Sequence, residues 1–217
     1  MKKLTMIGHR FEPVVTDAAN GYPIDARTLA TMEWSDREQV DIANTEQGIR
    51  LMQMRSPSQR KMLLVVPAAF SSFASVRARS KITSTVTRAA QDMGLKILFE
   101  IRNLSGVPLG RVMEVVSLLK PHCMTIMGHA GSDTRAIAGL KGCGLAGACI
   151  DHDSTKRDDS ALETYLTTLS TAARSSTGAC MVVGFDNLHQ MAVARLAGIT
   201  HASVKASALL ASRPLSA

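Results

Sequence analysis

Aromatic residues are scarce in this chain of 217 residues, and their scarcity argues against one large class of function. They make up 4% of the sequence, too few for the stacking platform with which proteins bind single-stranded nucleic acid. The formal net charge is +7, but the basic residues are scattered along the chain. The charge therefore favours anionic partners only in a general way, and we expect no nucleic-acid partner.

Paired cysteines are also lacking. The four cysteines, Cys123, Cys143, Cys149 and Cys180, form no Cys-x-x-Cys pair, and three of the four stand inside apolar runs. A cysteine in such a run usually behaves as a small hydrophobic residue. The pattern argues against a disulfide framework and a structural zinc site. Cys149, inside a predicted strand with no base visible nearby in the sequence, is expected to pack rather than to act as a nucleophile.

Long apolar runs are absent as well. The longest, residues 62–70, is well short of the roughly 18 residues that a membrane-spanning helix needs. The N-terminus begins Met-Lys-Lys, but Arg10 and Glu12 interrupt it before a signal-peptide core can form. We therefore expect a cytoplasmic protein with no membrane association.

Short apolar runs that alternate with amphipathic stretches dominate the rest of the chain. Continuous apolar runs are typical of strands covered on both faces, and six are predicted, at residues 62–67, 96–102, 123–128, 145–151, 179–185 and 200–204. Helices are predicted between them from apolar faces, caps and terminal glycines: 35–54, weakened by Gly48; 75–93, ending at Gly94; 107–120; 133–142, capped by Asp133; one opened by the capping box Ser160–Glu163; and 187–198, capped by Asn187. This alternation indicates a parallel α/β fold.

The N-terminal segment carries a different pattern. Asn20-Gly21 is a strong turn signal between two extended runs, 9–15 and 22–24, and predicts an antiparallel hairpin. Two hairpin strands and six further strands make eight, and no linker divides the chain. We therefore expect one domain over residues 1–217, a closed (β/α)8 TIM-like barrel that is compact beside the usual length of about 250 residues.

Five short segments, in order and spacing, resemble EAL domains, the barrel phosphodiesterases that hydrolyse cyclic di-GMP. Phe99-Glu-Ile-Arg102 resembles the E-[IV]-T-E strand, and Ile150-Asp151 resembles the end of the I-K-I-D strand. The remaining three are 181–190, similar to E-G-V-E-T-x-x-Q; 197–201, similar to L-G-x-[DH]; and 11–15 with Asn20-Gly21, similar to the [FY]-Q-P-I hairpin and its T-G turn. The resemblance spans nearly the whole chain and implies an EAL-type barrel with an antiparallel first strand.

The residues that carry EAL chemistry are mostly replaced. Active EAL enzymes hold two divalent cations through carboxylates and an asparagine, and the metals activate water for attack on a phosphodiester. Glu100 matches a metal-ligating glutamate, but the Glu-Ala-Leu tripeptide and the asparagine expected in the 63–67 strand are absent. Other ligand positions of the family are taken by Asn103, Gly128, His129, Cys149, Val183 and Ser203. The resemblance thus implies the fold, and the departures predict a degenerate, catalytically inactive domain with no catalytic residue, metal or cofactor.

Four residues remain as tentative ligand-binding positions of a relic site: Glu100, His129, Asp151 and Lys205. Glu100 is a relic ligand, a partner for a nearby base, or a plain strand-end carboxylate. His129 and Asp151, with His152 and Asp153, either build a metal site of another type or form polar loops. Lys205 either faces a bound phosphate or is solvated.

Three functions follow from these alternatives. The first is an inactive EAL-like module that regulates bacterial signalling through an unidentified protein partner. The second is a receptor that binds cyclic di-GMP or another anion without cleaving it, although the lost polar contacts make tight dinucleotide binding doubtful. The third is a metal-dependent phosphodiesterase rebuilt around Glu100, His129 and Asp151. A homodimer is expected from the resemblance, since EAL domains often pair through barrel helices.

Overall fold

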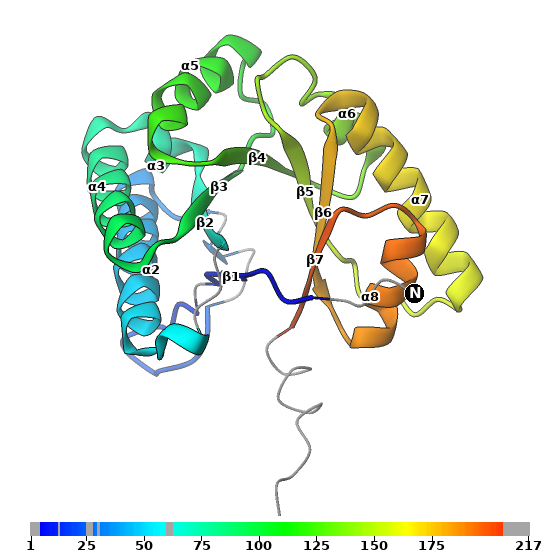
Figure 1. Ribbon diagram of the computed structural model, residues 1–217. Helices are drawn as coiled ribbons and strands as arrows, with labels where there is room; N and C mark the ends of the chain where they lie inside the picture. The colour runs from blue at the N-terminus through cyan, green and yellow to red at the C-terminus, as the bar shows by residue number, and fades with distance from the viewer. Residues whose placement is uncertain (1–4, 13, 25–27, 30, 60–62, 206–217) are drawn as a thin grey trace, which may run out of the picture. The chain divides into compact units, whose positions relative to one another are not determined.

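The computed structural model describes residues 5–12, 14–24, 28–29, 31–59 and 63–205 (Figure 1). Their contacts divide them into two compact units. The N-terminal unit comprises the described residues of 5–104 and 111–126, and the C-terminal unit those of 105–110 and 127–205. Each is described by itself below, and the expectation of a single domain stays a prediction.

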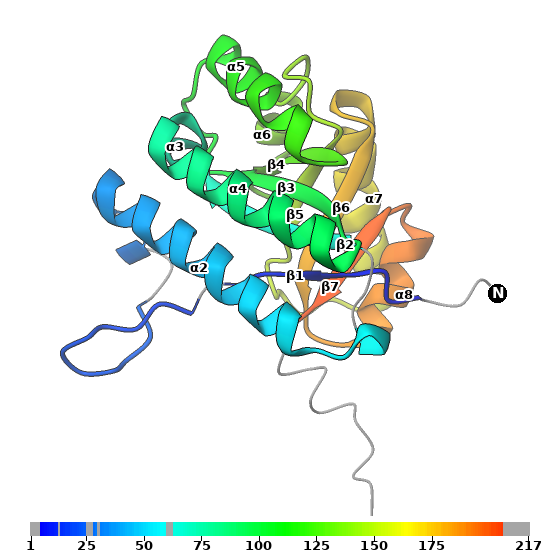
Figure 2. The same cartoon turned by 60° about the vertical axis from the view of Figure 1, so that its left-hand side comes forward.

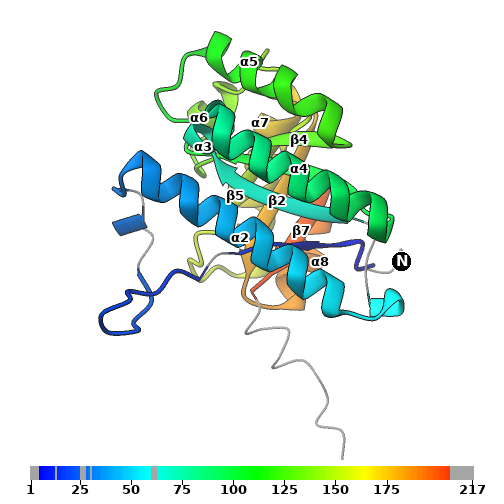
Figure 3. The ribbon, with the colours of Figure 1, turned by 90° about the vertical axis from the view of Figure 1, so that its left-hand side faces the viewer.

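Three parallel strands form the centre of the N-terminal unit. The middle strand, β2 (Leu63–Ala69), pairs with β1 (Gly8–Arg10) on one side and β3 (Lys96–Arg102) on the other. The remaining elements are α2 (Trp34–Met54), α3 (Phe70–Ala74), α4 (Val76–Met93), most of α5 (Leu109–Leu119), and the 3-10 helices η1 (Pro57–Gln59) and η2 (Lys120–His122). Figures 2 and 3 show α2 and α4 side by side, with α2 in contact with β2 and α4 with β3.

Phe11, directly after β1, explains the glycine inside α2. Its ring lies against Gly48, where an added Cβ would stand 2.5 Å from three ring carbons. Both residues are buried. Glycine at position 48 therefore lowers the helix propensity of α2. It also leaves room for the Phe11 ring, which packs the chain after β1 against the helix.

Four parallel strands form the C-terminal unit. They pair in chain order: β4 (Thr125–Ala130), whose first two residues belong to the other unit, β5 (Gly147–Asp151), β6 (Ala179–Phe185) and β7 (His201–Val204). Its helices are α6 (Thr134–Ala138), α7 (Asp159–Ser176) and α8 (Leu188–Leu196). Helix α7 packs against β5 and β6, and α8 packs against β6 and β7 (Figure 1).

The six strands predicted from apolar runs are confirmed as β2 to β7, with small shifts at their ends; Met62, the first predicted residue, lies outside the described residues. The predicted caps Asp133 and Asn187 accept backbone hydrogen bonds from Arg135 and Gln190. The predicted capping box at Ser160 is wrong by two residues, because the N-cap of α7 is Asp158, whose Oδ1 accepts a hydrogen bond from Ala161 N at 2.8 Å. Cys143, Cys149 and Cys180 are buried, as expected for small hydrophobic residues.

The predicted antiparallel hairpin strands are wrong. The first strand, β1, runs parallel to β2. The Asn20-Gly21 turn forms, but its pairing within the described residues is one isolated antiparallel bridge, Thr16 to Pro23. Val14 and Tyr22 are 77% and 73% exposed, so the turn has no apolar face to bury that would extend the pairing. Pro13 lies outside the described residues. The described residues thus contain seven strands in place of the eight expected.

No helix among the described residues combines the length and the apolar character that crossing a bilayer requires.

Candidate functional site

Glu100 lies near the carboxyl end of β3, on the face of the strand that points away from the helices. Its neighbour Phe99 packs edge-on against Phe73 of α3, with ring centroids 5.3 Å apart. Because successive side chains of a strand alternate between faces, Glu100 points the other way. It is completely buried, with 0% of its surface exposed, so its carboxylate must be satisfied within the protein.

Arg10, the last residue of β1, satisfies that carboxylate with two parallel hydrogen bonds. Its Nε donates to Oε2 of Glu100 at 2.8 Å, and its Nη2 donates to Oε1 at 3.0 Å. In the sheet, Arg10 lies opposite Val65, and Val65 lies opposite Leu98. Glu100 is two residues after Leu98 and therefore points to the same face as Leu98 and Arg10. The pair spans β2 and joins two strands that are 90 residues apart in the sequence.

Arg102 adds a second guanidinium to the same carboxylate. It ends β3 two residues after Glu100, on the same face, and its Nε lies 3.1 Å from Oε1 of Glu100. The Arg10 side chain is 11% exposed and that of Arg102 31%. Charge-assisted, bidentate contacts of this kind are among the strongest in proteins. Both oxygens of Glu100 are therefore engaged by arginines.

The next residue, Asn103, occupies the position of the second glutamate in the EAL signature. Its backbone is left-handed, with φ of 58°, a conformation that asparagine tolerates better than most side chains. Asn103 is exposed. It serves to turn the chain at the end of β3.

Asp41 of α2 is a second buried carboxylate in the N-terminal unit, and it was missed from the sequence. Its Oδ2 accepts hydrogen bonds from the backbone N–H of Ala69 at 2.8 Å and from the Ser72 hydroxyl at 2.6 Å. Burial raises the pKa of Asp41, and these two bonds together with Arg37 and Arg102 oppose the rise. Asp41 thus ties α2 to the end of β2 and to α3.

The spacing of α2 did carry a signal for Asp41. The buried residues of this helix are Asp41, Thr45, Gly48, Ile49 and Met52, a stripe at helical spacing. A carboxylate in that stripe predicts a buried acid with its own hydrogen-bond donors.

The groups around the Glu100 carboxylate do not form a binding site for a divalent metal ion. Magnesium and calcium are bound by several oxygens with open lone pairs, whereas both Glu100 oxygens accept from guanidinium groups. The positive charges of these two guanidinium groups, Arg10 and Arg102, oppose an incoming cation. Within the described part of the chain, no group of three His, Cys, Asp or Glu side chains is arranged to hold a metal ion.

In the C-terminal unit, two of the predicted residues come together. His129 of β4 lies opposite Cys149 of β5, and Asp151 follows two residues later on the same face. Nε2 of His129 is 3.0 Å from Oδ2 of Asp151, although the angles are not those of a hydrogen bond. The pair is an ion pair only when His129 is protonated, and the Asp151 side chain is 58% exposed.

His152 directly follows Asp151 in the chain. It is buried, and its contacts are with residues other than His129 and Asp151. Its ring lies 4.8 Å from that of Phe185, and its Nδ1 accepts a hydrogen bond from the N–H of Ser154 at 3.3 Å. Burial lowers the pKa of His152, and the charges of Arg157 and Lys205 lower it further, while Asp153 and Asp186 oppose the change. His152 is therefore a neutral, packed side chain at pH 7.

Lys205, predicted either to face a phosphate or to be solvated, has two polar protein groups beside it, and its side chain is 44% exposed. Its Nζ donates to Oδ1 of Asp186 at 2.7 Å and to the Ser154 hydroxyl at 2.8 Å. Asp186, which the sequence did not single out, balances its charge. Similarly, Asp153 receives two hydrogen bonds from Arg157, both 2.7 Å long. These polar groups hold the loops after β5 and β6 to the end of β7.

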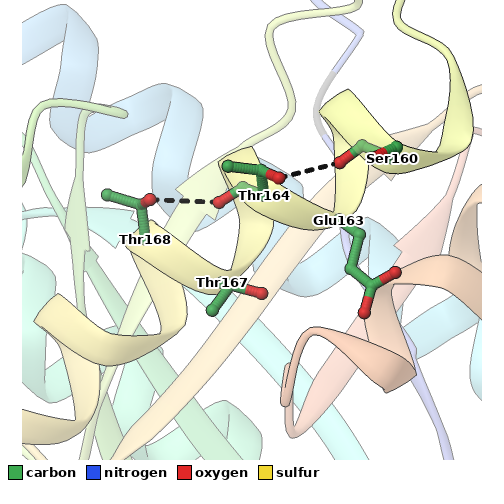
Figure 4. Close-up of a pocket in the computed structure, with 5 residues that line it drawn as sticks. All are labelled: Ser160, Glu163, Thr164, Thr167 and Thr168. Atoms are coloured by element: carbon green, nitrogen blue, oxygen red, sulfur yellow. Dashed lines mark hydrogen bonds between the residues drawn. The ribbon is translucent and has the colours of Figure 1, made fainter.

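A shallow depression lies on the surface of α7 (Figure 4). It is lined by Ser160, Glu163, Thr164, Thr167 and Thr168. Thr164 and Thr168 donate to carbonyl oxygens one turn earlier in the same helix, Ser160 O and Thr164 O. The lining comes from one face of one helix and contains none of the predicted site residues.

Comparison with solved structures shows that the fold is similar to that of EAL domains. The Xanthomonas citri FimX EAL domain, solved in complex with c-diGMP, has a TM-score of 0.55 and 16% identity over 83% of this chain and 73% of its own. Bacillus subtilis YkuI, with an EAL domain in complex with its substrate c-di-GMP and calcium, has a TM-score of 0.60 and 12% identity over 91% of this chain and 49% of its own. Vibrio cholerae LapD (S helix-GGDEF-EAL, apo) has a TM-score of 0.58 and 14% identity over 83% and 45%.

No family model and no curated protein matches the chain. At these identities the likeness concerns the fold, and at that level it confirms the resemblance found in the sequence.

Proposed function

We propose that this chain is a catalytically inactive EAL-like domain that acts in bacterial signalling as a regulatory or protein-interaction module. The observation that supports the proposal is the state of Glu100. The one carboxylate that matches the metal ligands of EAL enzymes is buried and held by Arg10 and Arg102. A metal-dependent phosphodiesterase needs that carboxylate for its cations.

The size of the electrostatic effect supports this proposal. A divalent cation about 4 Å from one guanidinium would be repelled by on the order of 8 kcal/mol at an effective dielectric constant near 20. One carboxylate already shared with two arginines does not offset that repulsion. An EAL-like domain without metals keeps its rigid strands and helices, and such surfaces suit a protein partner.

A second candidate is a receptor that binds cyclic di-GMP or another anion without cleaving it. The similarity to the FimX EAL domain solved with c-diGMP favours this candidate. Against it, Lys205 is already paired with Asp186. A third candidate, a phosphodiesterase rebuilt around His129 and Asp151, draws support only from their 3.0 Å contact.

Two other features of the proposal have other grounds. Pairing of two copies into a homodimer comes from the resemblance to EAL domains, and a cytoplasmic location comes from the short apolar runs of the sequence.

Calorimetric titration with cyclic di-GMP separates the first two candidates. The full chain is titrated without divalent ions and again with Mg²⁺ and Mn²⁺. We expect no saturable heat at micromolar dinucleotide in any of the three buffers. Saturable binding would replace the interaction module with the receptor, and the Lys205→Ala and Asp186→Ala variants would then show whether this strand end contacts the ligand.

A further inference from the structure

We propose that Arg10 and Arg102 are permanent counter-cations of Glu100 that take the place of a metal ion, so that the N-terminal unit is complete without one. This inference deepens the proposed function, because it names what replaced the metal at the same carboxylate. It concerns cation binding and stability, and its test involves no dinucleotide.

The contacts of Arg10 show why the replacement is permanent. Its guanidinium meets both oxygens of Glu100, at 2.8 and 3.0 Å, and its side chain is 11% exposed. Arginine keeps its charge at any physiological pH and matches a carboxylate with a planar fork. A divalent ion would have to displace a buried, bidentate partner that also joins β1 to β3.

The positive charges around this strand end already outnumber the buried carboxylates, without any added cation. Glu100 and Asp41 are its buried carboxylates. Arg10 and Arg102 face Glu100, and Arg37 and Arg102 act on Asp41. Three guanidinium groups thus attend two carboxylates. This cluster already carries an excess of positive charge, so it has no electrostatic need for a metal.

Removing the arginines would leave this carboxylate without positive partners. A carboxylate kept out of water without such a partner is strongly unfavourable. One carboxylate offers too few ligands for a divalent ion, and no group of three metal-binding side chains lies among the described residues. The structure therefore predicts that loss of the arginines destabilises the fold and that a divalent cation does not restore it.

The test is thermal unfolding of the full chain and its variants in EDTA, in Mn²⁺, and in NaCl of matched ionic strength. We expect the melting temperature of the natural protein to be the same in Mn²⁺ and in matched NaCl. Arg10→Met/Arg102→Met should melt lower by on the order of 10 °C in EDTA, and millimolar Mn²⁺ should not restore the loss. The added substitution Glu100→Gln should recover part of it, because it removes the unpaired buried charge.

A milder variant, Arg10→Lys, keeps both positive charges beside Glu100 but loses the bidentate contact. It covers the case in which the double variant does not fold, and it should show a smaller loss with no Mn²⁺ response. The inference is overturned if the natural protein itself is stabilised by Mn²⁺ through Glu100, or if the folded arginine variants melt at the temperature of the natural protein. Cleavage of cyclic di-GMP by the natural protein would refute the proposed function, whereas these melting curves decide the role of the arginines.

Discussion

Two buried carboxylates of the N-terminal unit are stabilised in different ways. Glu100 is paired with charged groups, Arg10 and Arg102. Asp41 accepts hydrogen bonds from neutral donors, a backbone N–H and a hydroxyl. A charge whose hydrogen bonds come from neutral donors still carries much of its desolvation cost. The pKa of Asp41 is accordingly raised by burial, although Arg37 and Arg102 oppose the rise. We therefore expect the amide substitution Glu100→Gln to lower the stability of the natural protein and Asp41→Asn not to lower it.

Asp41→Asn should leave stability unchanged or raise it slightly at pH 7, because one amide oxygen can accept both hydrogen bonds that Oδ2 now accepts. Asp41→Ala removes the acceptor from two buried donors and should cost about 2–3 kcal/mol. Urea unfolding of the two variants at pH 7 measures both effects. A large loss in Asp41→Asn would show that the charge itself is required.

The raised pKa of Asp41 also predicts how the stability of Asp41→Asn compares with that of the natural protein as the pH changes. Since Asp41 binds its proton more tightly in the folded state, its contribution to stability is greatest at low pH. That contribution is lost as the pH rises from the ordinary value of 3.8 through the raised folded value. Asp41→Asn should therefore gain relative to the natural protein as the pH rises through this window, and a constant difference would contradict the assignment.

His152 predicts a second pH effect with the opposite sign. Its pKa is lowered from 6.5, chiefly by burial, so the unfolded chain binds the proton first. Stability should fall as the pH drops below about 6.5, by at most about 1.4 kcal/mol per pH unit for one group. His152→Phe, which keeps a ring against Phe185, should remove part of this slope between pH 7 and pH 5 in urea titrations. His122→Phe, at an exposed position, is the matched control and should leave the slope in place.

At the residue scale, the sequence identified a carboxylate and missed its partners. Glu100 was found because it ends an apolar strand and matches a family motif. Arg10 stands 90 positions earlier, and nothing local in Gly8-His-Arg10 reveals a partner across β2. Lys205 was identified as well, but its neutralisation by Asp186 depends on two strand ends meeting. Partners that are distant in the chain require the register of the sheet.

At the scale of elements, Gly48 and Phe11 show how one helix is fitted to the chain after β1. Alanine usually stabilises a helix interior by about 1 kcal/mol relative to glycine. At position 48 the new Cβ would stand 2.5 Å from ring carbons of Phe11. The ring must therefore move, and overpacking of this kind costs about 1–3 kcal/mol.

Gly48→Ala should thus destabilise the protein, and Gly110→Ala in α5 should stabilise it slightly. Gly110 has open space where its Cβ would stand, so it reports helix propensity without a clash. Denaturant unfolding of both variants gives the comparison. Stabilisation by Gly48→Ala would mean that the Phe11 ring is not held in this place.

Elements with strong periodicity were predicted well, and the one dominated by turn chemistry was not. Strands β2 to β7 follow from their apolar runs, and α4 from its apolar face and Gly94, which takes a left-handed conformation with φ of 64°. The Asn20-Gly21 motif correctly predicted a turn. It could not predict strands, because strand pairing needs buried faces that Val14 and Tyr22 do not provide. The short helix α3 gave no periodic signal.

At the scale of the whole molecule, the fold is similar to that of EAL domains, and our proposal is that EAL chemistry is absent from it. The fold similarity holds at 12–16% identity for the solved structures compared above. Near the end of β3, guanidinium groups meet the carboxylate of Glu100. A shared fold does not imply a shared chemistry, because packing depends on many apolar positions and a metal site depends on a few ligands.

The most direct test of this interpretation is an assay for cleavage of cyclic di-GMP. The purified full chain is incubated with the dinucleotide in Mg²⁺ and in Mn²⁺, and linear pGpG is quantified by chromatography against an enzyme-free control. We expect no product above the control in either metal. Linear pGpG that forms with the natural protein and disappears in Glu100→Gln would contradict the proposal and establish Glu100 as a working ligand despite its arginines.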